Sequence, residues 1–131
     1  MMTSALPMDV YAEGNNPNEG IMPLYNCFSK AISAVIANGN SVECKSNIVV
    51  YSGEEWVSVT QTIEKKSSSG SWTSTKYTWS KNATTPTIGY IYTNTTTISD
   101  GGTYRLRSDL VVKTSSGTKE TVTSYSGTFT I

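Results

Sequence analysis

The stretch that most constrains the fold is residues 100–112, which read DGGTYRLRSDLVV. Asp-Gly-Gly is a turn sequence, because glycine adopts the positive φ angles that a tight corner requires. The residues after it alternate with a period of two, which predicts a β-strand with one apolar face. That face carries Tyr104, Leu106, Ser108, Leu110 and Val112, and the other face carries Arg105, Arg107 and Asp109.

The rest of the chain predicts the same class, an all-β domain. Threonine is frequent and alternates with apolar residues, as in strands whose surface is half-buried. Together with 104–112, the predicted strands are 28–37, 41–51, 56–65, 71–80, 88–97 and 118–131, the last with a bulge at Gly127. Their inward faces predict a core of Ile36, Cys44, Ile48, Val59, Ile63, Tyr104, Leu106 and Leu110.

A tyrosine that follows an Asp-Gly corner at the head of a strand resembles the tyrosine corner of immunoglobulin-like sandwiches. The order of the elements is also similar to that in an immunoglobulin-like domain: a cysteine-containing strand, then strand 56–65, then this corner and strand 104–112. The resemblance implies a two-sheet antiparallel β-sandwich of about seven strands. Leu106 stands where such domains have their second cysteine, so their disulfide between the sheets is not expected here.

Short motifs between Gly20 and Ile131 resemble those of small secreted proteins of Gram-positive, often gut, bacteria. They are Pro23-Leu24-Tyr25, Gly70-Ser71-Trp72 and Trp79-Ser80. That family carries no assigned activity, so the resemblance supplies no functional residues.

The N-terminal region predicts processing and secretion. Residues 1–12 resemble the remnant of a signal peptide, because Val10-Tyr11-Ala12 has small residues at the positions that a signal peptidase reads. Cleavage is expected before Glu13, within a longer precursor. Residues 13–26 are rich in Asn, Gly and Pro, which predicts a flexible linker. Residues 27–131 are predicted to form the sandwich.

The two cysteines leave two alternatives open. A pair of cysteines in a secreted chain favours a Cys27–Cys44 disulfide. A hairpin turn at Asn38-Gly39, however, places Ala37 opposite Asn40, Cys44 opposite Ser33 and Cys27 opposite Val50. The cysteines would then lie roughly 20 Å apart along the ladder, whereas a bridge needs Cα atoms within about 7 Å. Either the segment before the first strand folds back, or Cys44 is a small buried apolar residue.

The composition argues against several function classes. The chain has no histidine, which removes the usual acid–base and nucleophilic constellations, so no enzyme activity and no catalytic residue are predicted. The cysteines lack zinc spacing, and neither a metal nor another cofactor is expected. Ten basic and ten acidic residues give a formal net charge of zero, which argues against a nucleic-acid partner. No apolar run is long enough to predict a membrane span.

Aromatic residues of the 71–80 strand are the candidate binding residues. Alternation puts Trp72 on one face and Tyr77 and Trp79 on the other, so one of the two sets is expected to reach solvent. The predicted function is a secreted, non-catalytic module that binds a glycan or a surface protein through these rings. The alternatives are a structural or self-associating extracellular protein and a bacteriocin-like or toxin protein. The sequence does not fix the oligomeric state.

Overall fold

A computed structural model describes residues 28–85 and 88–131, apart from the side chains of residues 28 and 29, so the predicted signal-peptide remnant and linker lie outside the described residues. The described part of the chain forms eight strands and no helix that could cross a membrane. The strands are β1 (Phe28–Asn38), β2 (Ser41–Val50), β3 (Glu55–Lys66), β4 (Trp72–Asn82), β5 (Gly89–Thr97), β6 (Thr103–Lys113), β7 (Lys119–Tyr125) and β8 (Phe129–Thr130).

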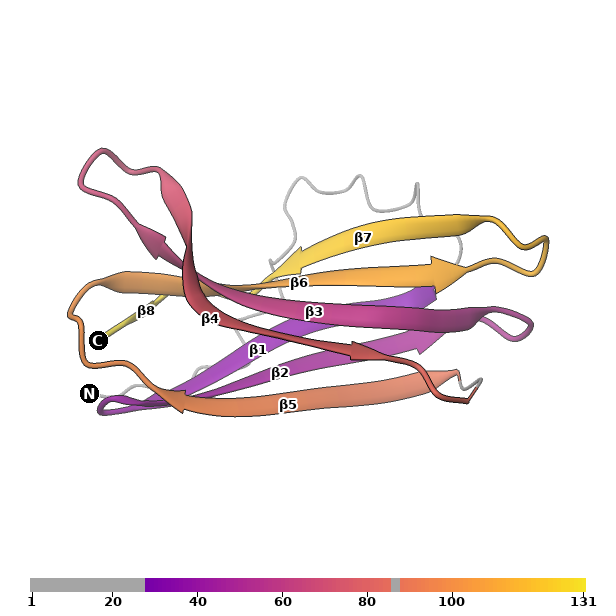
Figure 1. Ribbon diagram of the computed structural model, residues 1–131, viewed down its shortest axis with the longest axis horizontal. Helices are drawn as coiled ribbons and strands as arrows, with labels where there is room; N and C mark the ends of the chain where they lie inside the picture. The colour runs from indigo at the N-terminus through magenta and orange to yellow at the C-terminus, as the bar shows by residue number, and fades with distance from the viewer. Residues whose placement is uncertain (1–27, 86–87) are drawn as a thin grey trace.

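The eight strands form two antiparallel sheets packed face to face (Figure 1). Sheet A has the order β1-β2-β5, and sheet B has the order β4-β3-β6-β7, with β8 paired to β6 beyond the end of β7. The predicted two-sheet antiparallel sandwich is therefore confirmed. The corner strand β6 lies inside sheet B, between β3 and β7.

The last predicted strand divides into β7 and β8 at the place where a bulge was expected. β7 pairs Tyr125 with Arg107, whereas β8 pairs Phe129 with Tyr104, so the chain around Gly127 contains one extra residue. The backbone N–H of Leu106 donates to Ser126 Oγ at 2.8 Å and so keeps a partner across the interruption. One extra residue in one strand of a pair is the defining feature of a β-bulge.

The β1–β2 hairpin turns one residue later than predicted. Asn38 pairs with Ser41, and the two-residue loop is Gly39-Asn40. Gly39 has a φ of 64°, whereas Asn40, like every other described non-glycine residue, has a negative φ. A two-residue hairpin turn of this kind needs glycine at its first central position. The expected pairing of Ala37 with Asn40 is therefore wrong, and Cys44 lies opposite Val35.

The inward face of β1 also differs from the prediction. Ile36 is 38% exposed, whereas Ser33, Val35 and Ala37 are buried. Both faces of this strand carry apolar residues, so its alternation could not select the inner one. The other seven predicted core residues are buried: Cys44, Ile48, Val59, Ile63, Tyr104, Leu106 and Leu110.

The core between the sheets is divided into two apolar clusters. One is formed by Ile48, Val50, Trp56, Val59, Leu110, Val112 and Val122. The other is formed by Val35, Val42, Cys44, Ile63, Ile98, Tyr104 and Leu106. Five buried polar residues, here called the polar layer, occupy strand positions between those of the two clusters: Ser33, Ser46, Gln61, Ser108 and Ser124.

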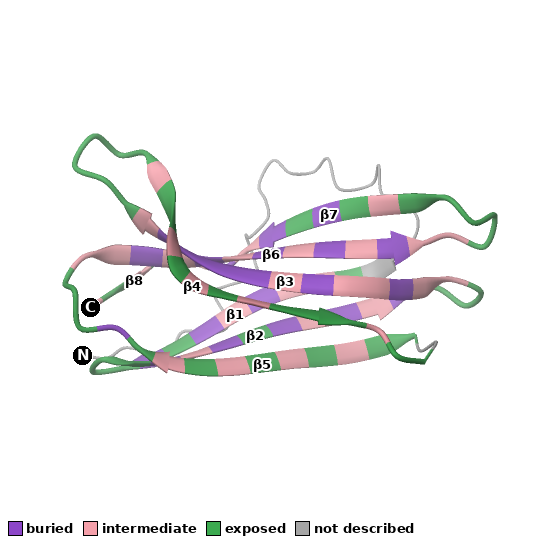
Figure 2. Cartoon of the chain, viewed as in Figure 1, coloured by how far each residue is buried: buried purple, intermediate pink, exposed green. Residues whose placement is uncertain are grey.

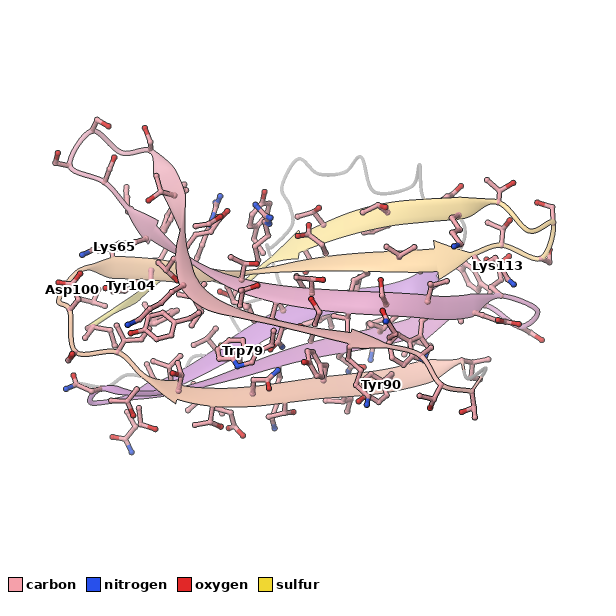
Figure 3. The ribbon with its side chains drawn as sticks, viewed as in Figure 1. Lys65, Trp79, Tyr90, Asp100, Tyr104 and Lys113 are labelled. Carbon is pink, nitrogen blue, oxygen red and sulfur yellow. The ribbon has the colours of Figure 1, made fainter. Side chains whose placement is uncertain are left out.

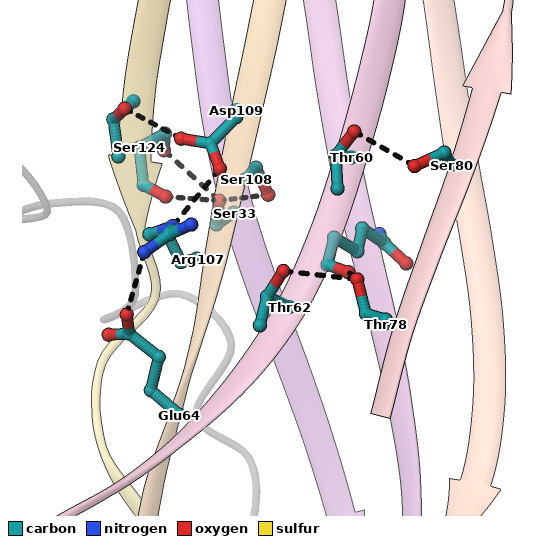
Figure 4. A network of polar contacts seen from close by, with 12 residues as sticks. Ser33, Thr60, Thr62, Glu64, Thr78, Ser80, Arg107, Ser108, Asp109 and Ser124 are labelled. Carbon is teal, nitrogen blue, oxygen red and sulfur yellow. Dashed lines mark hydrogen bonds and ion pairs between the residues drawn. The ribbon is translucent and has the colours of Figure 1, made fainter. Parts of the chain in front are cut away.

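The polar layer is hydrogen-bonded from one sheet to the other (Figure 4). Ser33 Oγ donates to Ser108 Oγ at 2.6 Å and lies 3.1 Å from Ser124 Oγ, while Ser46 Oγ bonds Ser108 Oγ at 2.6 Å. Gln61 Nε2 donates to Ser46 Oγ at 2.8 Å. Since a buried hydroxyl or amide is costly unless it is bonded, this layer favours one alignment of the two sheets.

The predicted tyrosine corner lies at the start of β6. The Tyr104 hydroxyl donates to the backbone carbonyl of Asp100 at 2.5 Å, and the ring is buried. The Asp100 carboxylate accepts a hydrogen bond from Lys65 Nζ at 2.6 Å, which raises the pKa of the Lys65 ammonium. These three residues lie together at one end of the sandwich, opposite the end that holds Lys113 (Figure 3). The corner therefore ties the β5–β6 connection to sheet B.

Replacing Tyr104 by Phe tests the corner. The change removes the hydroxyl that bonds the Asp100 carbonyl and keeps the buried ring. We expect the free energy of unfolding to fall by about 1 kcal/mol, the usual net value of one hydrogen bond. Urea denaturation measures it, with Tyr51→Phe as the control because Tyr51 is 49% exposed. Equal midpoints for the two variants would mean that the corner bond contributes nothing.

Candidate functional site

The three predicted aromatic residues lie on β4, the end strand of sheet B. Trp72 pairs with Lys66, and both lie on the outer face of the sheet. Trp79 pairs with Gln61, and both lie on the inner face. Tyr77 and Trp79 pack against the core cluster that contains Leu106. The predicted alternation is therefore correct. All three rings are half-buried. The prediction that either Trp72 or the Tyr77/Trp79 pair would be fully open to solvent is therefore met only in part.

An irregularity in β4 sets the position of Trp72. Thr62 pairs with Thr78 and Glu64 with Ser74, so three residues of β4 lie opposite the single residue Ile63. The Thr75 hydroxyl donates to the Ile63 carbonyl at 2.6 Å, which satisfies an acceptor that the regular ladder would use. Extra residues bend the strand that contains them, and β4 curves sharply along its length (Figure 1).

Arg105 lies between Trp72 and a second aromatic ring. Its guanidinium carbon is 4.4 Å from the centroid of the Trp72 ring and 4.0 Å from that of Tyr125. Lys66 adds a second cation, with Nζ 6.0 Å from the Trp72 centroid. Cations this close to ring faces are attracted by the ring quadrupole. We call Trp72, Arg105 and Tyr125 the outer patch.

Carboxylates hold the arginines of this face in place. Glu64 accepts from Arg105 Nε at 2.8 Å and from an Arg107 terminal nitrogen at 3.0 Å. Arg107 Nε also donates to Asp109 at 3.0 Å, and the Thr123 hydroxyl donates to the other Asp109 oxygen at 2.7 Å (Figure 4). The Glu64 side chain is 6% exposed, so it is largely removed from water. The ion pairs therefore fix the direction of both guanidinium groups.

The charge of Arg107 is reinforced by its neighbours. Partial burial lowers the pKa of its guanidinium, and the Asp109 and Glu64 carboxylates raise it by more, so that the net direction is upward. A group that stays charged and oriented contributes a fixed donor to the surface.

Sequence reasoning did not join Arg105 and Tyr125 to Trp72. The three residues belong to β6, β7 and β4, and β3 lies between β4 and β6. Their contact follows from the strand order and register of sheet B, which no local pattern specifies. The available signal was the alternation of β6, which puts Arg105 on the outward face, away from Tyr104 and Leu106.

Cys44 is buried and has no disulfide partner among the described residues, and Cys27 lies outside them. The Cys27–Cys44 disulfide therefore stays a prediction. Burial, and then the neighbouring Glu43 carboxylate, raises the pKa of Cys44 to about 12. The thiolate is the reactive form, so burial makes a thiol at this position unreactive at neutral pH.

A hollow of about 290 Å³ lies near the β3 and β4 ends that face away from the corner. Its lining residues are Glu55, Trp56, Val57, Ala83, Thr84, Thr85, Lys113 and Lys119. Trp56 stacks on Tyr90 with ring centroids 4.4 Å apart, and its indole nitrogen is buried without a hydrogen-bond partner among the described residues. Because that nitrogen is covered, it is not part of the surface of the hollow.

The outer patch can bind by apolar contact with its two rings and by hydrogen bonds from the oriented Arg105 guanidinium group. Within residues 28–85 and 88–131, no three His, Cys, Asp or Glu side chains are grouped to hold a metal ion. No protein-family model matches the chain, and no curated protein sequence matches it either. The candidate site therefore rests on its geometry.

Proposed function

We propose that this chain is a secreted, non-catalytic binding module that recognises a partner protein outside the cell through the outer patch. The observation that carries the proposal is the position of Arg105 between the rings of Trp72 and Tyr125. Tryptophan, tyrosine and arginine are the residues most enriched where protein interfaces concentrate their binding energy.

The rigidity of the patch supports the same function. Arg105 is bonded to a carboxylate that is itself largely buried, so little side-chain entropy remains to be lost when a partner binds. Trp72 and Tyr125 are half-buried, which leaves part of each ring for contact with a partner. A preorganised patch of this kind needs neither a metal nor a cofactor.

The geometry favours a protein over a glycan. A sugar ring stacks on an open aromatic face. The Arg105 guanidinium lies over one face of Trp72 and one face of Tyr125, at 4.4 and 4.0 Å. Those two faces are therefore occupied within the chain itself. Binding of a glycan is the competing outcome, and the same experiment detects it.

Replacing Trp72 by Ala tests the proposal. The purified chain is screened against a panel of extracellular proteins and a glycan array, and the affinity of each hit is measured again with the variant. We expect a protein hit whose dissociation constant rises by about tenfold or more, as at the centre of an interface.

Tyr51→Ala is the matched control, because Tyr51 is an exposed aromatic residue outside the outer patch. The control should keep the affinity of the unmodified chain, and Trp72→Phe should recover part of it. Thermal unfolding shows whether each variant is folded. A protein hit that tolerates Trp72→Ala, or a glycan hit that depends on Trp72, would contradict the proposal.

A further inference from the structure

The end strand β5 differs from the other end strands of the sandwich. It pairs with β2 along its whole length, from Val49–Gly89 to Ser41–Thr97, without a register shift. Among the described residues no strand pairs with its other edge. Residues 90–97, at about 3.4 Å each, give a straight edge of roughly 27 Å along which another strand could pair.

This edge lacks the devices that usually prevent strands from pairing between molecules. Such devices are charges, prolines and bulges. β1 carries Lys30 and a register shift, β4 carries Lys76 and Lys81, and β7 begins with Lys119 and Glu120. β5 reads GYIYTNTTT, with no charge and no proline.

The outward-facing residues of β5 are open to solvent. Exposed and half-buried positions alternate along the whole strand (Figure 2). Ile91 is 57% exposed, and Ile88, just before the strand, is 59% exposed. A long, flat edge with exposed branched apolar residues is a site where another strand can add to a sheet.

We infer that β5 pairs with β5 of a second copy of this chain, antiparallel about a two-fold axis near Thr93. The two copies of sheet A then form one continuous six-stranded sheet. In this register Thr93 lies opposite its own copy, a favourable cross-strand pair, and Ile91 lies opposite Thr95. No charge opposes a like charge, since the strand has none.

The second copy is the occupant that the chain favours. A two-fold axis makes an antiparallel strand self-complementary, so one edge supplies both halves of the interface. The formal net charge of zero removes long-range repulsion between copies. The interface is small, so a weak dimer is expected, with a dissociation constant in the micromolar to millimolar range.

The test is light scattering of the full chain up to about 1 mM, together with two lysine variants at exposed threonines. Thr93→Lys puts two lysines together at the two-fold axis, whereas Thr121→Lys makes the same change on the end strand β7. We expect the weight-average mass of the unmodified chain to rise above 14.2 kDa, towards twice that value, as the concentration increases. Thr93→Lys should raise the dissociation constant by about tenfold or more, and Thr121→Lys should leave it unchanged.

Hydrogen exchange of the unmodified chain gives a test that needs no variant. Amides of β5 should gain protection at the concentration where the dimer forms, and those of β4 and β7 should not. A chain that stays monomeric at 1 mM would overturn the inference. So would a dimer that Thr93→Lys leaves intact, that Thr121→Lys dissociates, or whose added protection falls on β4 or β7.

Discussion

Leu106→Ala is expected to lower the free energy of unfolding by about 2–5 kcal/mol. Leu106 is fully buried and pairs with Ile63 across the centre of sheet B. It packs in the cluster that also contains Val35 and Tyr104, so the deletion leaves a cavity that both sheets line. The loss combines the transfer free energy of the missing carbons with the cost of that cavity.

Urea denaturation followed by circular dichroism measures this loss as a lower midpoint with an unchanged slope. Ile88→Ala is the matched control, because it shortens a branched apolar side chain that is 59% exposed. The control should change the stability by no more than about 0.5 kcal/mol. A Leu106→Ala midpoint equal to that of the control would show that the core assignment is wrong.

Gln61→Leu is expected to destabilise the chain by about 1–3 kcal/mol, although it makes the core more apolar. Gln61 Nε2 donates to Ser46 Oγ at 2.8 Å and to the Tyr92 carbonyl at 3.1 Å, and Gln61 Oε1 accepts from Asn94 at 2.9 Å. Leucine has nearly the same size but none of these bonds. Three polar groups in or near the core then lose a partner.

Ile63→Leu provides the comparison for Gln61→Leu. Ile63 lies on the same face of β3, and the exchange of one apolar shape for another should cost less than about 1.5 kcal/mol. Gln61→Leu should be the less stable of the two in urea. A Gln61→Leu variant as stable as the unmodified chain would mean that the polar layer is dispensable for stability.

The sequence predicted the strands and the corner well, because both depend on local chemistry. Alternation located β2, β3 and β6, and the Asp-Gly corner with its tyrosine located the start of β6. The inner face of β1 was predicted wrongly, since Ile36 and Val35 are equally apolar choices. The hairpin turn lies one residue later than predicted, which shifts every cross-strand partner by two residues, because Asn38-Gly39 and Gly39-Asn40 are both turn sequences.

The polar layer and the outer patch were beyond local patterns for different reasons. The alternation of β6 already put Ser108 on the face of Leu106 and Leu110, but its partners come from strands of both sheets. The outer patch needs β4, β3, β6 and β7 to be consecutive strands of one sheet, with the register that brings Arg105 to Trp72. Alternation did separate Trp72 from Trp79, because it depends on the strand alone.

The most direct test of the proposed recognition surface uses the three tryptophan indole N–H signals in a nitrogen-15 NMR spectrum. The chain has three tryptophans, and each lies in a different place. Trp72 is in the outer patch, Trp79 is on the inner face of β4, and Trp56 lines the hollow. Adding a partner protein identified in the binding screen should shift or broaden the Trp72 indole signal and the Arg105 Nε–H signal. The Trp56 indole signal should keep its position. A Trp72 signal that stays fixed while that of Trp56 moves would contradict the account.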